Sequence, residues 1–147
     1  MMDTNVKGLI YVSRTVLPFM VDQNSVHVLN IGSTAGAGAY AKGAVYCASK
    51  AAVKTISDGM RIDLIATDVK VTNVQPGITE TDFSKVRFHG DAAKAAKVYE
   101  GIEALQAEDI ANAVVYCTNQ PRRVQISDIT VMVKQQATNN MKHKVTK

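Results

Sequence analysis

The chain consists of two kinds of segment that differ in the spacing of their hydrophobic residues. In the longer segments apolar residues recur every three or four positions, as on one face of a helix. The shorter segments are nearly continuous apolar runs, which are typical of strands buried on both faces. The first spacing predicts helices over residues 4–20, 45–67 and 107–118. The second predicts strands over residues 26–31, 69–74 and 126–133.

The segments between these elements have loop character. Residues 32–43 are rich in Gly and Ala, and Pro76-Gly77 is expected to stop the second strand. Residues 78–104 are mixed and predict short helices. Helices that alternate with strands indicate an α/β protein with a parallel sheet. Three strands are few for such a sheet, and the chain opens on a helix instead of a strand.

Composition indicates one globular domain over residues 1–147. No apolar run approaches the 18 residues of a membrane span, and the first ten residues lack the pattern of a signal peptide. Cys47 and Cys117 form no metal-spaced cluster and favour a reducing compartment. We therefore expect a cytoplasmic protein that has no metal site and no contact with a membrane.

The charge pattern argues against nucleic acid as a partner. The net charge is +4, but basic residues are scattered except at Arg122-Arg123 and in the tail 141–147. We expect this tail to be a solvated terminus. Eight aromatic residues do not interleave with basic ones as a stacking surface requires.

Tyr46 and Lys50 form the first candidate for chemistry. Residues four positions apart lie on one face of a helix, so both side chains can point into the same site. A cation about 4 Å from a phenol contributes around 4 kcal/mol at an effective dielectric near 20, enough to lower its pKa by about three units. Such a pair would act as a general acid and base near neutral pH. Taken alone, a half-exposed tyrosine beside a surface lysine is the commoner meaning of this spacing.

Hydroxyl side chains follow two of the predicted strands. Ser33 comes directly after the first strand, and Thr79 and Thr81 follow the second. Open α/β sheets bind ligands outside the carboxyl ends of their strands. We therefore expect these hydroxyls to lie near Tyr46 and Lys50.

The whole set of motifs resembles the short-chain dehydrogenase/reductase family. The resemblance rests on DTNVKG with Asn5, NIGSTAG with Ser33, YCASK with Tyr46 and Lys50, and PGITET, in this order and at the family's spacing. Within the family the chain is most similar to NADP-dependent 3-hydroxy acid (serine) dehydrogenases, on DTNVKGLI, on TETDFSKVRFHGD and on the last strand. The resemblance implies a Rossmann-like, doubly wound parallel sheet that is incomplete at its N-terminal half.

The resemblance also implies roles for four catalytic residues. Tyr46 would exchange a proton with the substrate oxygen while hydride moves to or from the nicotinamide. Lys50 would lower the pKa of that tyrosine and hold the nicotinamide ribose, and Ser33 would position the substrate oxygen. Asn5 would anchor a water molecule in a proton relay behind Lys50.

Further residues would hold the cofactor and the substrate. The resemblance implies that the turn after the second strand packs on the nicotinamide. A guanidinium suits bidentate binding of a carboxylate, so Arg87 would bind the acid group of a 3-hydroxy acid such as serine or 3-hydroxypropionate; the alternative is a surface arginine. The implied cofactor contacts are Tyr46, Lys50, Pro76, Gly77, Ile78, Thr79 and Thr81.

The chain departs from the family at its start. Members begin with a strand, a Gly-rich turn and a helix that hold the dinucleotide phosphates, and this chain shows no counterpart. NADP follows from the resemblance alone, and NAD remains an alternative because the segment that separates the two is absent. We expect the catalytic portion of a dehydrogenase that forms a homodimer or homotetramer. The alternatives are an inactive fragment or pseudoenzyme that serves as a dimerisation or interaction module, and an unrelated α/β domain with coincident motifs.

Overall fold

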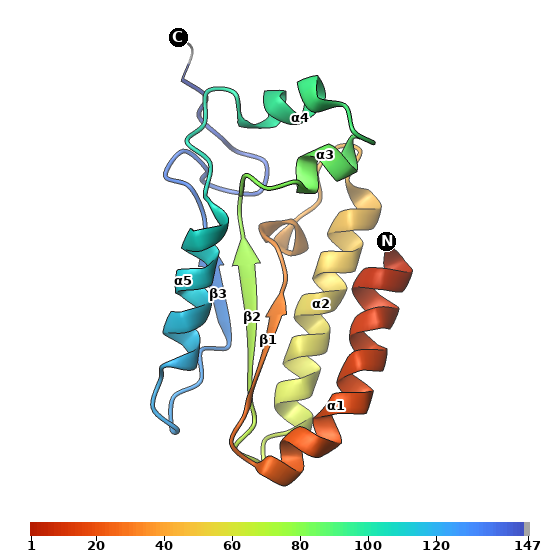
Figure 1. Ribbon diagram of the computed structural model, residues 1–147, viewed down its shortest axis with the longest axis vertical. Coiled ribbons are helices and arrows are strands. Elements are labelled where there is room, and N and C mark those ends of the chain that lie inside the picture. Colours follow the sequence, from red (N-terminus) through yellow and green to blue (C-terminus); the bar gives the residue numbers. More distant parts are fainter. Residues whose placement is uncertain (146–147) are drawn as a thin grey trace.

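A three-stranded parallel sheet forms the centre of the molecule. The computed structural model describes residues 1–145 and orders the strands β1 (His27–Ile31), β2 (Lys70–Pro76) and β3 (Asp128–Val131). Val28 lies opposite Val71, and Val74 lies opposite Ile129. Because the three strands are parallel, their carboxyl ends share the upper edge of the sheet in Figure 1. The α/β architecture with a parallel sheet is confirmed.

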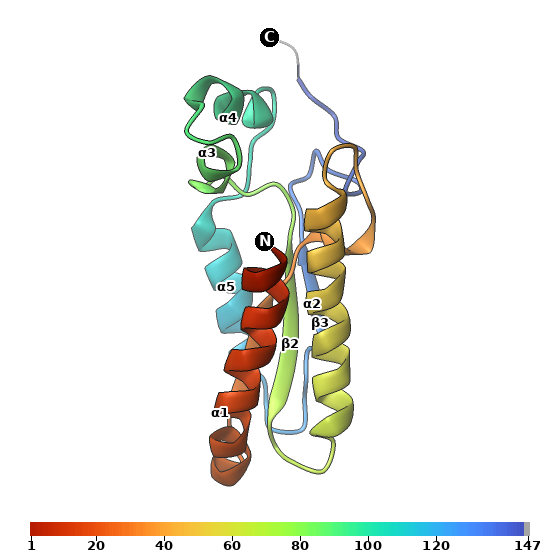
Figure 2. The ribbon, with the colours of Figure 1, turned by 90° about the vertical axis from the view of Figure 1, so that its right-hand side faces the viewer.

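Helices cover both faces of this sheet. In the views of Figures 1 and 2, α2 lies on one face, with α1 beside it, and α5 lies on the other. The short helices α3 and α4 stand above the carboxyl edge. The helices are the π-helix η1 (Asp3–Gly8), α1 (Leu9–Gln23), the 3₁₀-helix η2 (Thr34–Ala37), α2 (Ala44–Asp63), α3 (Phe83–Arg87), α4 (Ala92–Tyr99) and α5 (Ala107–Thr118).

The main core joins α1 and α2 to the sheet. Val71 is fully buried, and Met60, Leu64 and Val69 pack with it. Partly buried apolar residues of α1, among them Leu17 and Met20, pack against this cluster. The apolar face of α2 therefore meets the core directly, whereas α1 contributes only partly buried residues to it.

The predicted elements recur with small shifts. Helix 107–118 has the predicted bounds, and the ends of each predicted strand move by no more than two residues. The second predicted helix, 45–67, ends four residues earlier, at Asp63. The first predicted helix is a π-helix followed by an α-helix, and Pro18 lies inside the latter. Pro76 is the last residue of β2; it has no amide hydrogen to donate, and the following Gly77 amide donates to the Val131 carbonyl at 2.7 Å.

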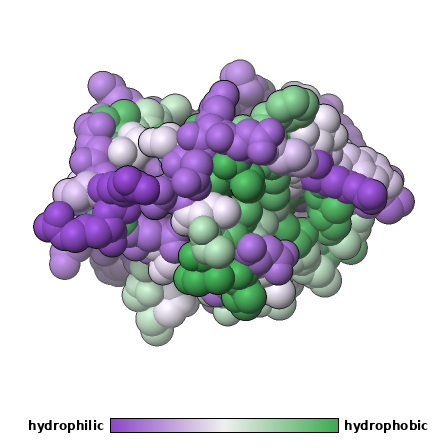
Figure 3. Space-filling view, turned by 90° about the horizontal axis from the view of Figure 1, so that it is seen from below, coloured by the Kyte–Doolittle hydropathy of each residue, from purple (hydrophilic) through white to green (hydrophobic). Residues whose placement is uncertain are grey.

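One side of the sheet is open. Among the described residues, β1 pairs only with β2, and the side chain of Ile31 is 50% exposed. The lower end of the molecule also carries apolar surface, seen as green atoms in the centre of Figure 3. Ile62 and Ile65, near the end of α2, are 72% and 85% exposed. An unpaired strand edge and exposed apolar side chains favour association with other polypeptide surfaces.

Candidate active site

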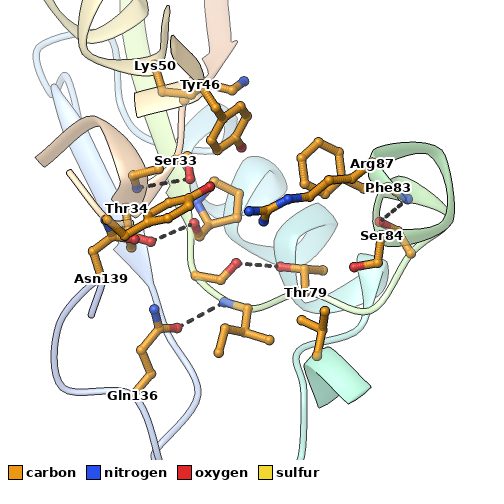
Figure 4. A pocket seen from close by; sticks show the side chains of 18 of the residues that line it. Ser33, Thr34, Tyr46, Lys50, Thr79, Phe83, Ser84, Arg87, Gln136 and Asn139 are labelled. Carbon is orange, nitrogen blue, oxygen red and sulfur yellow. Dashed lines mark hydrogen bonds between the residues drawn. The ribbon is translucent and has the colours of Figure 1, made fainter. Parts of the chain in front are cut away.

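A cavity of about 830 Å³ lies at the carboxyl edge of the sheet. It is bounded by the segments that follow β1 and β2, by the first turns of α2, by α3, and by the C-terminal segment (Figure 4). A volume of this size is in the range of cofactor and ligand sites. The cavity brings together every predicted site residue: Asn5, Ser33, Tyr46, Lys50, Pro76, Gly77, Ile78, Thr79, Thr81 and Arg87.

Ser33 occupies the position where β1 gives way to η2. Its backbone is extended, and its Oγ accepts a hydrogen bond from the Ala35 amide at 3.1 Å. This contact caps η2 and fixes the hydroxyl at the cavity wall. An accepting hydroxyl still has its own proton, so Ser33 can donate that proton to a ligand oxygen.

The Tyr46 ring extends from the first turn of α2 into the cavity (Figure 4). It is half-buried and lies 5.5 Å from the Phe83 ring, centroid to centroid. This contact with α3 holds the phenol in the space between β1 and the segment after β2. The side chain therefore has the placement that a proton donor to a bound ligand needs.

Lys50 lies one turn further along α2, as the sequence predicted. Its Nζ donates a hydrogen bond to the Ile31 carbonyl at 2.8 Å and stands 6.0 Å from the centroid of the Tyr46 ring. The carbonyl at the end of β1 thus holds the ammonium on the side of α2 that faces Tyr46. Burial lowers the pKa of Lys50.

Asn5 is connected to the same turn of α2. It lies within the π-helix η1, and its Nδ2 donates to Ser49 Oγ at 3.1 Å. Ser49 Oγ in turn donates to the Tyr46 carbonyl at 2.7 Å. Asn5 thus braces the turn of α2 that carries Tyr46, and π-helical turns are frequent at functional sites.

The turn after β2 forms the cavity floor and is held from two sides. Gln136 Oε1 accepts a hydrogen bond from the Ile78 amide at 2.9 Å, and Thr34 Oγ1 donates to the Pro76 carbonyl at 3.4 Å. Tyr99 donates from its hydroxyl to the Thr79 carbonyl at 3.3 Å. The predicted cofactor loop is therefore built into the fold by side chains from three other segments.

Arg87 ends α3 and faces the cavity (Figure 4). Its guanidinium carbon lies 5.4 Å from the Tyr40 ring centroid and 5.5 Å from that of Phe88. Burial raises the pKa of Tyr40, and the nearby Arg87 charge opposes this rise. Among residues 1–145 the guanidinium has no carboxylate partner. The rings orient a cation that remains available to an anion.

The C-terminal segment contributes residues that the sequence patterns did not identify. Asn139 Nδ2 donates to the Gly38 carbonyl at 2.6 Å, and Asn140 Nδ2 donates to the Ala39 carbonyl at 2.8 Å. Residues 141–145 are exposed, as expected of a solvated tail, but Lys142 and Lys144 also line the cavity; positions 146 and 147 lie outside the described residues. A run of Gln and Asn carries no periodic signal, so only the amide-rich composition hinted at this role. The added lining residues are Gln136, Asn139, Asn140, Lys142 and Lys144.

Within residues 1–145 no three His, Cys, Asp or Glu side chains are grouped closely enough to hold a metal ion. Cys47 and Cys117 are buried and unpaired. No helix of the described chain has the length and apolar character needed to cross a membrane.

Several proteins of known identity are similar to this chain in sequence or in structure. NADP-dependent 3-hydroxy acid dehydrogenase YdfG of Salmonella typhi is 50% identical over 133 residues, which are 90% of this chain and 54% of that protein. The NADP-dependent 3-hydroxy acid dehydrogenase of Schizosaccharomyces pombe is 40% identical over 92% of this chain and 52% of its own length. The chain thus spans about half the length of the curated relatives it matches.

A solved structure described as the closed form of serine dehydrogenase complexed with NADP⁺ superposes with a TM-score of 0.92 at 44% identity. The match covers 99% of this chain and 59% of the other. The model of the short chain dehydrogenase family matches residues 1–92, which hold Asn5, Ser33, Tyr46 and Lys50. The chain therefore belongs to the short-chain dehydrogenase family.

Proposed function

We propose that residues 1–147 are the catalytic portion of an NADP-dependent oxidoreductase. The reaction is hydride transfer between NADP and the 3-hydroxyl group of a small 3-hydroxy acid, such as serine or 3-hydroxypropionate. The relatives at 40–50% identity carry this activity and cofactor in their names. The observation that carries the proposal is the meeting of Ser33, Tyr46 and the turn after β2 around one cavity.

The residues present suit the nicotinamide part of such a cofactor. The turn after β2 offers the hydroxyl groups of Thr79 and Thr81 beside the apolar surfaces of Pro76 and Ile78. These groups match a flat ring that bears a polar amide, and Lys50 would hold the ribose next to it. NADP, when bound, would accept or supply the hydride.

The chain's own residues would manage the proton and the orientation of the substrate. In the oxidative direction, the Tyr46 oxygen takes the proton of the substrate hydroxyl as the hydrogen on the same carbon leaves as hydride. Ser33 donates a hydrogen bond from its hydroxyl group to the substrate oxygen and so stabilises the charge that develops there. Arg87 holds the carboxylate. Asn5 acts indirectly, through Ser49, by keeping the Tyr46 turn in place.

Two measurements on the 147-residue chain test the proposal. The first is titration with NADPH, followed by nicotinamide fluorescence. The second is oxidation of serine and 3-hydroxypropionate by wild type and by Tyr46→Phe. Removing a general acid-base group costs about 10²–10⁴-fold in rate, so the variant should retain cofactor binding and lose turnover at least a hundredfold.

Tyr116→Phe is the matched control, because Tyr116 is exposed on α5 and does not line the cavity. It should keep wild-type activity. Absence of NADPH binding at millimolar concentration, or equal activity of wild type and Tyr46→Phe, would refute the proposal for this chain.

A second candidate function rests on the exposed apolar residues of α1. Tyr11 and Phe19 are 66% and 68% exposed, and Val12 lies beside Tyr11. We propose that this face and α2 mediate a homodimer or homotetramer, and that a catalytically silent chain would act through it. Sedimentation velocity of wild type and Phe19→Asp tests this alternative. A concentration-dependent oligomer that Phe19→Asp dissociates supports it, and a wild-type monomer at high concentration excludes it.

A further inference from the structure

The charges that line the cavity are of one sign. Four of its lining residues are Lys or Arg, and none is Asp or Glu. Lys50 lies in α2 one turn after Tyr46, and its ammonium donates a hydrogen bond to the Ile31 carbonyl. The other three come from the end of α3 and from the C-terminal segment: Arg87, Lys142 and Lys144.

These three cations lack acidic partners. Among residues 1–145, none of them forms an ion pair with a carboxylate. Lys144 Nζ donates to the Lys97 carbonyl at 3.2 Å, so it is held at the α4 side of the cavity. The pKa of Lys142 is lowered by partial burial and then by the charges of Lys144 and Arg87. These like charges repel one another, and no Asp or Glu side chain lines the same cavity.

The Arg87 side chain is more restricted in its orientation than the two lysine side chains. The Tyr40 and Phe88 rings flank its guanidinium, which limits the orientations available to it. A planar, restrained guanidinium binds one carboxylate in a bidentate manner. A substrate with a single carboxylate therefore occupies Arg87 and leaves the ammonium of Lys142, which is exposed at the cavity mouth, free to bind a second anionic group.

We propose that Arg87 and Lys142 form a two-point anion subsite and that the preferred substrate is a 3-hydroxy acid with a second carboxylate, such as 3-hydroxyglutarate. This inference rests on the proposed function and extends it to the substrate class. Arg87 binds one carboxylate, and Lys142 binds the other as a point charge. Lys144 strengthens the positive potential at the same wall.

The C-terminal segment is positioned for this role by its neighbours. Asn139 and Asn140 attach it to the backbone before α2, and Gln136 attaches it to the turn after β2. Both attachments lie within six residues of Lys142. The lysine therefore extends from a segment that is fixed to both walls of the cavity.

Binding calorimetry on the 147-residue chain in saturating NADP⁺ tests the inference. The two ligands are 3-hydroxyglutarate and its monomethyl ester, which has nearly the same size and one negative charge fewer. We expect the dicarboxylate to bind at least tenfold more tightly. Lys142→Gln should reduce this ratio below threefold while the Kd of the ester changes less than twofold. Lys134→Gln removes an exposed charge from the same segment, away from the cavity, and should leave the ratio unchanged.

The outcomes separate this inference from the proposed function. Equal affinity for both ligands, no binding of either, or the same loss of both in Lys142→Gln overturns the anion subsite. It is also overturned if Lys142→Gln weakens NADPH binding and leaves the preference intact, because the lysine would then serve the cofactor phosphates. If the wild-type chain does not bind NADPH but still binds the dicarboxylate more tightly than the ester, the proposed function is refuted and the subsite is supported.

Discussion

Gln136 connects the C-terminal segment to the turn that we propose as the cofactor loop. Its side chain is 5% exposed, and its Oε1 accepts the Ile78 amide hydrogen at 2.9 Å. Gln136→Leu keeps a side chain of similar size and removes the acceptor. The Ile78 amide, at a half-buried position beside the cavity, then loses its protein acceptor.

The expected cost follows from that lost partner. A typical intramolecular hydrogen bond contributes about 0.5–1.5 kcal/mol to the free energy of unfolding. Urea unfolding followed by circular dichroism should therefore show a free energy of unfolding lower by about this amount, with an unchanged slope. NADPH titration of the same variant should show weaker binding, because the turn after β2 loses one of its fixed contacts.

Gln23→Leu is the matched control. Gln23 is exposed at the end of α1, and the same substitution there should change the free energy of unfolding by no more than about 0.5 kcal/mol. If Gln136→Leu is as stable as Gln23→Leu, the hydrogen bond to Ile78 does not hold the turn. The argument for the C-terminal segment as a structural wall of the site would then fail.

Three further predictions concern packing and charge. In Gly32→Ala the new Cβ would overlap Asn73 Oδ1 and approach the Val74 carbonyl to 3.2 Å, so thermal unfolding should show a loss of about 1–3 kcal/mol, whereas Gly38→Ala, with open space around it, should be neutral. Val71→Ala removes two methyl groups from a fully buried position and should cost about 2–3 kcal/mol in urea unfolding; a cost below that of an exposed Val12→Ala would contradict the assigned core. Burial lowers the pKa of Lys50 in the folded state, so the unfolded chain retains this proton to higher pH and the stability attributable to Lys50 rises with pH up to about 10.4. Wild type should show a steeper rise than Lys50→Met across this range, because Lys142, whose pKa is also lowered, is present in both proteins; parallel curves would refute the prediction.

Much of the fold is determined by local patterns that the sequence displays directly. Helix 107–118 has a regular apolar spacing, and its predicted bounds match α5 because a capping box closes its start. The strands are equally clear as short apolar runs, but only β2 is buried along most of its length, because β1 and β3 lie at the two sides of the sheet. The convergence of Ser33, Tyr46 and the turn after β2 follows from one rule, that the carboxyl ends of parallel strands share an edge.

Other features depend on contacts that no local pattern records. The 3₁₀-helix at Thr34–Ala37 lies in a stretch of Gly and Ala that carries no periodicity. Lys50 lies near Tyr46 as expected, but the helical spacing does not show that its ammonium donates to the Ile31 carbonyl. That partner depends on which backbone groups the fold leaves unpaired.

The position of the C-terminal segment is the clearest example of a feature that is fixed by tertiary contacts. Asn139 and Asn140 hydrogen-bond to residues about a hundred positions earlier in the chain. Amide side chains bind any exposed carbonyl, so their partners are chosen by proximity in the folded molecule and not by sequence spacing. The sequence alone determined the elements and the catalytic edge, while tertiary structure decided which distant residues close the cavity and give it its charge.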